Sequence, residues 1–306
     1  MRKIVFILCS LILLTSCKMD ILNFSMSENV VPSPSVTPTP EVTAAPTEQP
    51  IPKEEIQPEE SPVIPSEPNN FMSLDNTGSG WGFVKKKGEK PSIPNKTQDI
   101  FKKYATYYMD PTEEKVLYLT FDEGYENGFT APILDTLKKC EVPAAFFITG
   151  SYLERETELV KRMIDEGHIV GNHTENHPNL HKLSEPEKMR QELEELDNKF
   201  FEIFGEHMKY MRPPEGEYSE RVLAVAKDAG YKTIFWSFAY KDWERDVIKG
   251  SQFAFDAVTP YLHSGSIILL HAVSQDNSDA LEDIINYAKE LGYEFKSLDE
   301  LPEFPV

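Results

Sequence analysis

The side chains best suited to chemistry in this 306-residue chain are acids, imidazoles and a guanidinium that stand at the ends of short apolar segments. The candidates for a single site are Asp122, Glu123, His173, His177, Arg212, Asp242 and His271. Carboxylates and imidazoles can act as general bases and general acids, and histidines together with a carboxylate can hold a metal ion. These residue types therefore indicate attack of water on a polarised carbonyl.

His173 and His177 are spaced as H-x3-H, so their rings lie one helical turn apart or meet on a tight loop. Pro178 follows directly, which disfavours a helix that continues through this point. In either arrangement the two imidazoles can share one metal ion, and a carboxylate suits the third position. Two nitrogen ligands and one oxygen ligand leave positions open, which is typical of a catalytic site. The spacing alone is a weak indicator of a metal.

Asp122 is the candidate general base, and His271 is the candidate general acid because imidazole titrates near neutrality. A carboxylate such as Asp242 would favour the protonated form of His271, and Arg212 could hold Asp122 through charge-assisted hydrogen bonds. Structural explanations exist for each residue alone: a helix cap for Asp122, an ordinary ion pair for Arg212 and a core position for His271. Their common location at segment ends favours the functional interpretation.

The apolar segments are the elements that must position the site. From Lys115 onward they alternate with helical stretches, which predicts an α/β fold with a parallel sheet. The predicted strands are nearly continuous in apolar residues, as strands covered on both faces should be: Val116–Phe121, Ala144–Thr149, Ile169–His173, Met208–Arg212, Thr233–Phe238, Ser266–His271 and Tyr293–Ser297. An open doubly wound sheet and a barrel both fit, and roughly seven units favour a barrel, complete or not. In both architectures sites lie at the carboxyl ends of strands.

Two helix starts are predicted from capping residues. Ser184 and Glu187 match an S-x-x-E capping box for a helix that ends at Gly205. Asn277 is the predicted N-cap of the last long helix.

The N-terminal part of the chain has a different character. MRKIVFILCSLILLTSC, residues 1–17, predicts a secretory signal that is too short to span a membrane. Its ending resembles the lipobox of bacterial lipoproteins, so we expect Cys17 to carry a lipid that anchors the exported chain at the outer face of the cytoplasmic membrane. The alternative is a signal peptide with a chance cysteine.

The segment from Val30 to Asn70 is dominated by Pro, Thr, Ser and Glu. It cannot bury enough apolar surface to fold, so residues 18–70 are predicted to be a disordered Pro-rich tether, or an unstructured tail that binds a partner. Residues 71–114 are expected to be an irregular lead-in to a catalytic domain at residues 115–306.

The formal net charge of −20 argues against a nucleic-acid partner and against electrostatic binding to anionic lipids. Of the three cysteines, Cys9 lies in the signal and Cys17 is assigned to the lipid, which leaves Cys140 alone. No intramolecular disulfide is therefore expected. We expect the chain to act as a monomer.

In this order TFDEG, HTENH, RPPEG, KDW and LLH resemble the five motifs of NodB-homology polysaccharide deacetylases, carbohydrate esterase family 4, over residues 115–300. The resemblance implies a distorted barrel of seven strand–helix units, (β/α)7, and metal-dependent removal of N-acetyl groups from sugars. The metal would be one divalent ion, zinc or another first-row transition metal.

The resemblance also implies roles for the candidate residues. Asp122 matches the catalytic base, Arg212 the residue that orients it, His271 the acid and Asp242 the partner of the acid. His173 and His177 match the metal histidines. Glu123 stands where the family has a metal-binding aspartate, and its longer side chain would bind the metal directly or support the other ligands. Sugar contacts are predicted at Tyr125, Trp243, Pro213 and Tyr218, although aromatic residues near strand ends are more often part of the core.

The flanking segments FDEGYENG, RPPEGEYSE, WSFAYKDWERD and LLHAVSQDN resemble the subfamily that de-N-acetylates muramic acid in peptidoglycan, which prepares muramic δ-lactam formation in the spore cortex. Glycan strands are thus the expected partner. Glu215 departs from the basic or aromatic residue of related sequences and would repel the lactyl carboxylate of muramic acid. The alternatives are a deacetylase of N-acetylglucosamine polymers or acetylated xylan, a decayed wall-binding lipoprotein, and a glycosidase, in which an H-x3-H pair has no role.

Overall fold

The computed structural model describes residues 70–303. The described residues all belong to one compact unit. The predicted signal peptide, Cys17 and the tether up to residue 69 lie outside the described residues. Over residues 70–303, none of the helices combines the length and the apolar character that a membrane span requires.

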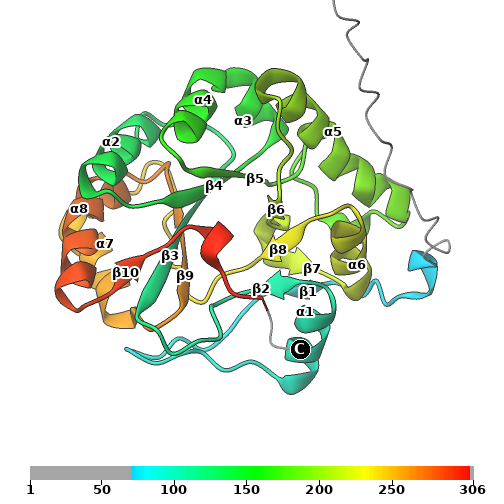
Figure 1. Cartoon of the computed structure of the whole chain (residues 1–306), viewed down its shortest axis with the longest axis horizontal. Coiled ribbons are helices and arrows are strands. Elements are labelled where there is room, and N and C mark those ends of the chain that lie inside the picture. Colours follow the sequence, from blue (N-terminus) through cyan, green and yellow to red (C-terminus); the bar gives the residue numbers. More distant parts are fainter. Residues whose placement is uncertain (1–69, 304–306) are drawn as a thin grey trace, which may run out of the picture. The chain divides into compact units, whose positions relative to one another are not determined.

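The centre of the fold is a sheet of eight strands that pair in parallel (Figure 1). Along the sheet they are β10 (Glu294–Phe295), β3 (Val116–Glu123), β4 (Ala144–Ile148), β5 (Ile169–Asn172), β6 (Tyr210–Met211), β8 (Lys232–Ile234) and β2 (Thr106–Tyr107), with β9 (Ser266–His271) also paired to β3. A parallel bridge between Phe238 and Ile268 returns the chain after β8 to β9, so the sheet curls into an incomplete barrel. This confirms the predicted α/β fold of parallel strands in a distorted barrel.

Helices surround this sheet on its outer side (Figure 1). They are α2 (Thr130–Cys140), α3 (Gly150–Arg155), α4 (Thr157–Asp165), α5 (Pro186–Phe204), α6 (Glu220–Asp228), α7 (Ser251–Val258) and α8 (Gln275–Glu290). Short 3-10 helices occur at η1 (Phe71–Ser73), η2 (Leu180–Lys182), η3 (Pro214–Gly216), η4 (Thr259–Tyr261) and η5 (Leu298–Glu300). Because the helices lie on the outer side of the sheet, the side chains at the carboxyl ends of the strands are available to form a site.

Strand alternation divides the core into two layers. In β3, Leu117, Leu119 and Phe121 pack toward the helices, whereas Val116 and Tyr118 pack inside the curled sheet. Because successive side chains of a strand point to opposite faces, the even positions of β3 face inward and the odd positions face the helices. This alternation decides which residues at the strand ends reach the interior.

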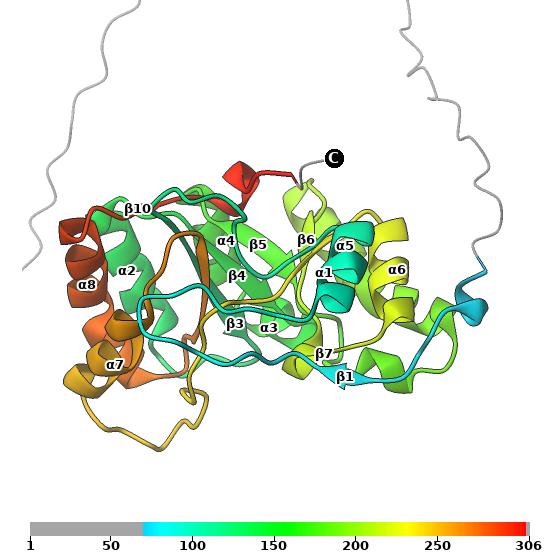
Figure 2. The ribbon, with the colours of Figure 1, turned by 90° about the horizontal axis from the view of Figure 1, so that it is seen from below.

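The lead-in before residue 115 is more ordered than the sequence suggested. It contains β1 (Ser79–Gly80), which pairs antiparallel with β7 (Glu217–Tyr218), as well as α1 (Asn95–Lys103) and the edge strand β2. Figure 2 shows this segment crossing in front of the strands before it turns into α1. Trp81 fixes it in place, because its indole N–H donates to the Trp236 carbonyl at 2.9 Å and its backbone N–H donates to the Gly216 carbonyl at 2.8 Å.

Both predicted helix caps are wrong by a few residues. The N-cap of α5 is Glu185 and not Ser184, because Pro186 occupies the first helical turn, where its fixed φ and missing N–H are tolerated. The helix does end at Gly205, which has a φ of 76°. The N-cap of α8 is Ser274, whose hydroxyl accepts from the backbone N–H of Asn277, so Asn277 lies inside the first turn.

Candidate active site

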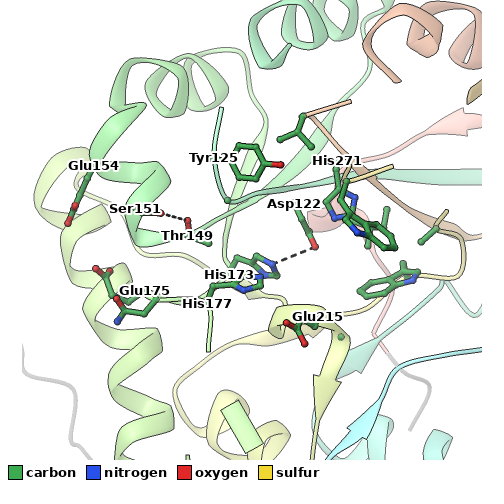
Figure 3. A pocket seen from close by; sticks show the side chains of 18 residues that line it. Asp122, Tyr125, Thr149, Ser151, Glu154, His173, Glu175, His177, Glu215 and His271 are labelled. Atoms are coloured by element: carbon green, nitrogen blue, oxygen red, sulfur yellow. Dashed lines mark hydrogen bonds and ion pairs between the residues drawn. The ribbon is translucent and has the colours of Figure 1, made fainter. Parts of the chain in front are cut away.

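A cavity of about 920 Å³ opens at the carboxyl ends of the strands. Asp122, His173, His177 and His271 all line it, and Figure 3 shows their side chains directed toward the same space. Asp122 and His271 lie at inward-facing positions on the neighbouring strands β3 and β9, where they are paired in register. The structure therefore brings together the predicted base, the predicted acid and both predicted metal histidines.

Arg212 anchors Asp122 from below the cavity. It is fully buried, and its Nη1 donates to Asp122 Oδ1 at 2.7 Å while its Nη2 donates to Thr120 Oγ1 at 2.9 Å. Burial alone would raise the pKa of Asp122, but the charges of Arg212 and two histidines outweigh it and hold this pKa below its ordinary value. Asp122 is therefore an ionised carboxylate in a fixed orientation, as a general base requires.

The imidazole of His271 is oriented by the carboxylate of Asp242, which is itself fixed by further hydrogen bonds. Its Nδ1 lies 2.8 Å from Asp242 Oδ1, and Asp242 Oδ2 accepts from the backbone N–H of His271 and from Asn277 Nδ2, at 2.9 Å and 2.6 Å. Burial acts to lower the pKa of His271, but Asp242, with help from Asp122, raises it above its ordinary value. The imidazole is thus favoured in its protonated form, with Nε2 left as the nitrogen that can deliver a proton.

The HTENH segment forms a tight loop and not a helical turn. Asn172 Oδ1 accepts from the Thr174 N–H at 2.8 Å, and Thr174 Oγ1 accepts from the His177 N–H at 3.0 Å. Thr174 and His177 have φ values of 69° and 57°, in the left-handed region that β-branched residues rarely enter. This strained turn brings the rings of His173 and His177 to a centroid distance of 4.9 Å.

The ring of His173 presents an unprotonated nitrogen to the cavity, where it can act as a metal ligand. Its Nδ1 lies 2.8 Å from the Arg212 carbonyl, which can only accept, so Nδ1 carries the proton. Nε2 is then unprotonated and lies 3.7 Å from Asp122 Oδ2. Burial, assisted by His177 and opposed by Asp122, lowers the pKa of His173 to about 4, so the ring is neutral at physiological pH. A neutral imidazole oriented by a carbonyl is the form in which histidine binds a metal.

The donor set fits the two-histidine half of the predicted metal site. Over residues 70–303, no cluster of three or more His, Cys, Asp or Glu groups is arranged to hold a metal ion. His173 and His177 would supply two nitrogen ligands. Of the two adjacent acids of β3, Asp122 lines the cavity with them, with its Oδ2 at 3.7 Å from His173 Nε2, and Glu123 does not.

Glu123 faces the opposite side of β3 from Asp122. It is fully buried, it does not line the cavity, and neither of its carboxylate oxygens has a hydrogen-bond partner among the described residues. Burial, together with Glu126 and Asp122, raises its pKa well above the ordinary value of a glutamate, and the side chain of Thr130 opposes this rise only in part. The predicted role as a metal ligand is therefore not supported by its placement, because β3 continues through residue 123 and strand alternation turns this side chain toward the helices.

The predicted sugar contacts divide into two groups. Tyr125 and Trp243 line the cavity and are 40% and 51% exposed, as side chains that stack on a sugar would be. Pro213 is buried before η3 and does not line the cavity. Tyr218 packs edge-on against Phe101 and Phe235 in an aromatic cluster beneath the lead-in, so its predicted substrate contact is not supported.

Several residues of the site were not among the predicted ones, and three of them hold or shape the predicted groups. Thr120 shares Arg212 with Asp122, Asn277 secures Asp242, and Trp236 lines the cavity. Thr120 could have been found from the strand period, because it precedes Asp122 by two positions on the same face. Asn277 belongs to the LLHAVSQDN segment, but a polar side chain near a helix start is more typical of a cap.

Comparisons with known proteins agree with this geometry. The family model described as polysaccharide deacetylase matches residues 109–234. Peptidoglycan-N-acetylmuramic acid deacetylase PdaA of Bacillus subtilis is 41% identical over 244 residues, which are 79% of this chain and 89% of the relative. A peptidoglycan-N-acetylglucosamine deacetylase of Bacillus cereus is 36% identical over 204 residues, 65% of this chain and 92% of the relative. The solved structure of B. subtilis PdaA, described as a family 4 carbohydrate esterase, superposes with a TM-score of 0.72 at 42% identity, covering 74% of this chain and 98% of that one.

Proposed function

Because this chain belongs to the polysaccharide deacetylases of carbohydrate esterase family 4, we propose that it hydrolyses the N-acetyl group of N-acetylmuramic acid residues in peptidoglycan. The observation that carries the reaction is the pairing of an ionised Asp122 with a protonated His271 on adjacent strands of one cavity. The choice of muramic acid is supported by PdaA, which is more similar over a longer span than the N-acetylglucosamine deacetylase of B. cereus.

Each residue of the site has a separate role in the proposed hydrolysis. Asp122 takes a proton from the attacking water, and Arg212 keeps the carboxylate ionised and aligned while it does so. His271 gives a proton from Nε2 to the sugar nitrogen, which leaves as an amine, and the acetyl carbon leaves as acetate. Asp242 and Asn277 hold the imidazole in place and favour the protonated form that the second step consumes.

One divalent metal ion, zinc or another first-row transition metal, is part of this proposal. It would be held by His173 and His177, whose neutral rings suit it. When bound, such an ion polarises the amide carbonyl and lowers the pKa of water. Metal analysis of the purified protein, with His177→Ala as the comparison, tests for it: the wild-type protein should retain one ion per chain and the variant none.

Acetate release from peptide-free peptidoglycan strands tests the reaction. Purified protein supplied with a divalent metal should release acetate, and mass spectrometry should locate the loss of the acetyl group on muramic acid. Asp122→Asn, which keeps the shape of the side chain, should be inactive. No release with any divalent metal, combined with binding to the glycan, would instead favour a decayed wall-binding protein.

A second candidate is deacetylation of N-acetylglucosamine residues. Glu215 favours it, because this acid lines the cavity and would repel the lactyl carboxylate that muramic acid carries and glucosamine lacks. Acetate release from an N-acetylglucosamine oligomer, compared with that from peptidoglycan strands at equal concentration, discriminates between the two.

The cellular setting is proposed from the sequence. A lipid at Cys17 anchors the exported monomer to the outer face of the cytoplasmic membrane, where it meets the glycan strands of the wall. There the free amine of muramic acid allows δ-lactam formation in the spore cortex. Cys17→Ser should release the protein from the membrane fraction, and a deletion strain should form cortex that lacks muramic lactam.

A further inference from the structure

The cavity is lined by acids whose charges are unevenly compensated. Asp122 is paired with Arg212, and Glu154 and Glu175 are both paired with Lys199. Glu215 has only the Asn179 amide, which donates to it at 3.2 Å, and within residues 70–303 no cation pairs with it. One wall of the cavity therefore carries an uncompensated negative charge.

A positive charge lies beside Tyr125, which lines the opposite side of the cavity. The Arg245 guanidinium lies over the ring of Tyr125, with its central carbon 5.3 Å from the ring centre. Arg245 makes no hydrogen bond or ion pair with the described residues, so its N–H groups are free. Figure 3 shows Tyr125 and Glu215 on opposite sides of the cavity, with Asp122 and His173 between them.

The loop that carries Arg245 is fixed at both ends. At its start, Asp242 is held by His271 and Asn277. At its end, the backbone N–H groups of residues 249 and 250 donate to the carboxylate of Asp276 at 2.8 Å and 2.9 Å. The hydrogen bonds that position the acid therefore also hold one end of the loop that carries Arg245.

We propose that Arg245 determines specificity by binding a carboxylate on the carbon next to the acetamido carbon of the sugar, as the lactyl ether of muramic acid provides. The inference rests on the proposed function and extends it to one residue. A guanidinium seated on an aromatic ring keeps its planar fork of donors free for a carboxylate. With Glu215 opposite, the two charges orient an anionic sugar with its lactyl group toward Tyr125.

Arg245→Gln tests the proposal, because Arg245 is exposed and its loss removes no buried contact. The matched control is Lys241→Gln on the same loop, a cation already paired with Glu244 at 2.7 Å. Three substrates are compared: peptide-free peptidoglycan strands, the same strands with the lactyl carboxylates methyl-esterified, and an N-acetylglucosamine oligomer. Binding of each substrate to metal-free protein is measured by calorimetry alongside kcat/KM.

Arg245→Gln should lose about tenfold in affinity and in kcat/KM on the peptidoglycan strands, as expected for one charge-assisted contact. It should lose nothing on the esterified strands or on the oligomer, where wild type and variant become equal. The wild-type advantage should shrink as salt is added, and Lys241→Gln should match wild type throughout.

An equal loss on all three substrates, or no loss on the strands, overturns the assignment of Arg245. A wild-type protein that binds the strands through Arg245 but releases no acetate from muramic acid refutes the proposed function and leaves the binding role intact. A wild-type protein that neither binds nor hydrolyses the strands overturns both.

Discussion

Replacement of Glu123 by methionine should stabilise the protein. The side chain is fully buried, and both carboxylate oxygens lack partners within the described residues. An unsatisfied buried polar group costs about 1–3 kcal/mol, and an apolar group of similar shape removes that cost. For a domain of this size, such a gain corresponds to a rise in Tm of roughly 2–12 °C.

The gain should depend on pH. The folded-state pKa of Glu123 lies above its unfolded value, so the folded protein binds the extra proton and loses stability as the pH rises between the two values. Below the unfolded pKa, about 4.3, the carboxyl is neutral in both states and only the polarity of the group is removed. Above it, the advantage of the variant should grow by up to about 1.4 kcal/mol per pH unit until the folded pKa is passed.

The assay is denaturant unfolding of metal-free wild type, Glu123→Met and Glu123→Gln between pH 4 and pH 8. Glu123→Gln isolates the charge, because it keeps a polar group of the same shape but cannot ionise. Calorimetric titration with divalent metal should give the same affinity for all three proteins, whereas His173→Ala should lose it. A variant that is less stable than wild type at pH 8, or that binds metal at least tenfold more weakly, would refute the placement of Glu123 outside the metal site.

The remaining predictions concern the charged pairs and the lead-in. Asp242→Asn removes the carboxylate that raises the pKa of His271, so the alkaline limb of the kcat/KM profile should move to lower pH, with kcat reduced about 100-fold or more. If the alkaline limb does not move, a group other than His271 titrates there. Arg212→Met leaves Asp122 as an unpaired buried acid, and denaturant unfolding should show a loss of about 3–5 kcal/mol. The acidic limb should also move to higher pH, since the pKa of Asp122 is no longer held down. Trp81→Phe keeps an aromatic ring but loses the indole N–H, so KM should rise with kcat nearly unchanged; equal KM values would show that the contact does not shape the cavity.

The central strands and their site could be predicted because the same physical rule produces both. β3, β4, β5 and β9 are nearly continuous in apolar residues, and the predicted bounds agree with the observed ones within two residues. Parallel strands place their carboxyl ends on one edge of the sheet. The acidic and imidazole side chains at those ends therefore lie close together. This rule predicts that Asp122, His173, Arg212 and His271 lie close together, which is how the structure places them.

The structure does not place Glu123 and Tyr218, two of the predicted site residues, at the cavity. Asp122 and Glu123 are adjacent, and the motif suggested that both serve the site, but a strand that continues through residue 123 sends them to opposite faces. Tyr218 was assigned to substrate because it follows a motif, whereas the lead-in covers it with other aromatic rings. The two-residue strands β1, β2 and β7 are too short to leave a periodic pattern, so the order of the lead-in could not be predicted.

The hydrogen bonds of Trp81 also limit how far the protein can be truncated from its N-terminus. A fragment that starts at residue 109, where the match to the family model begins, would contain every predicted catalytic residue. It would nevertheless lack the partners of Gly216 and Trp236, and it would expose the aromatic cluster that Trp81 and Phe101 share. Expression trials should therefore find that the shortest soluble and active fragment begins close to residue 70, well before the start of the match to the family model.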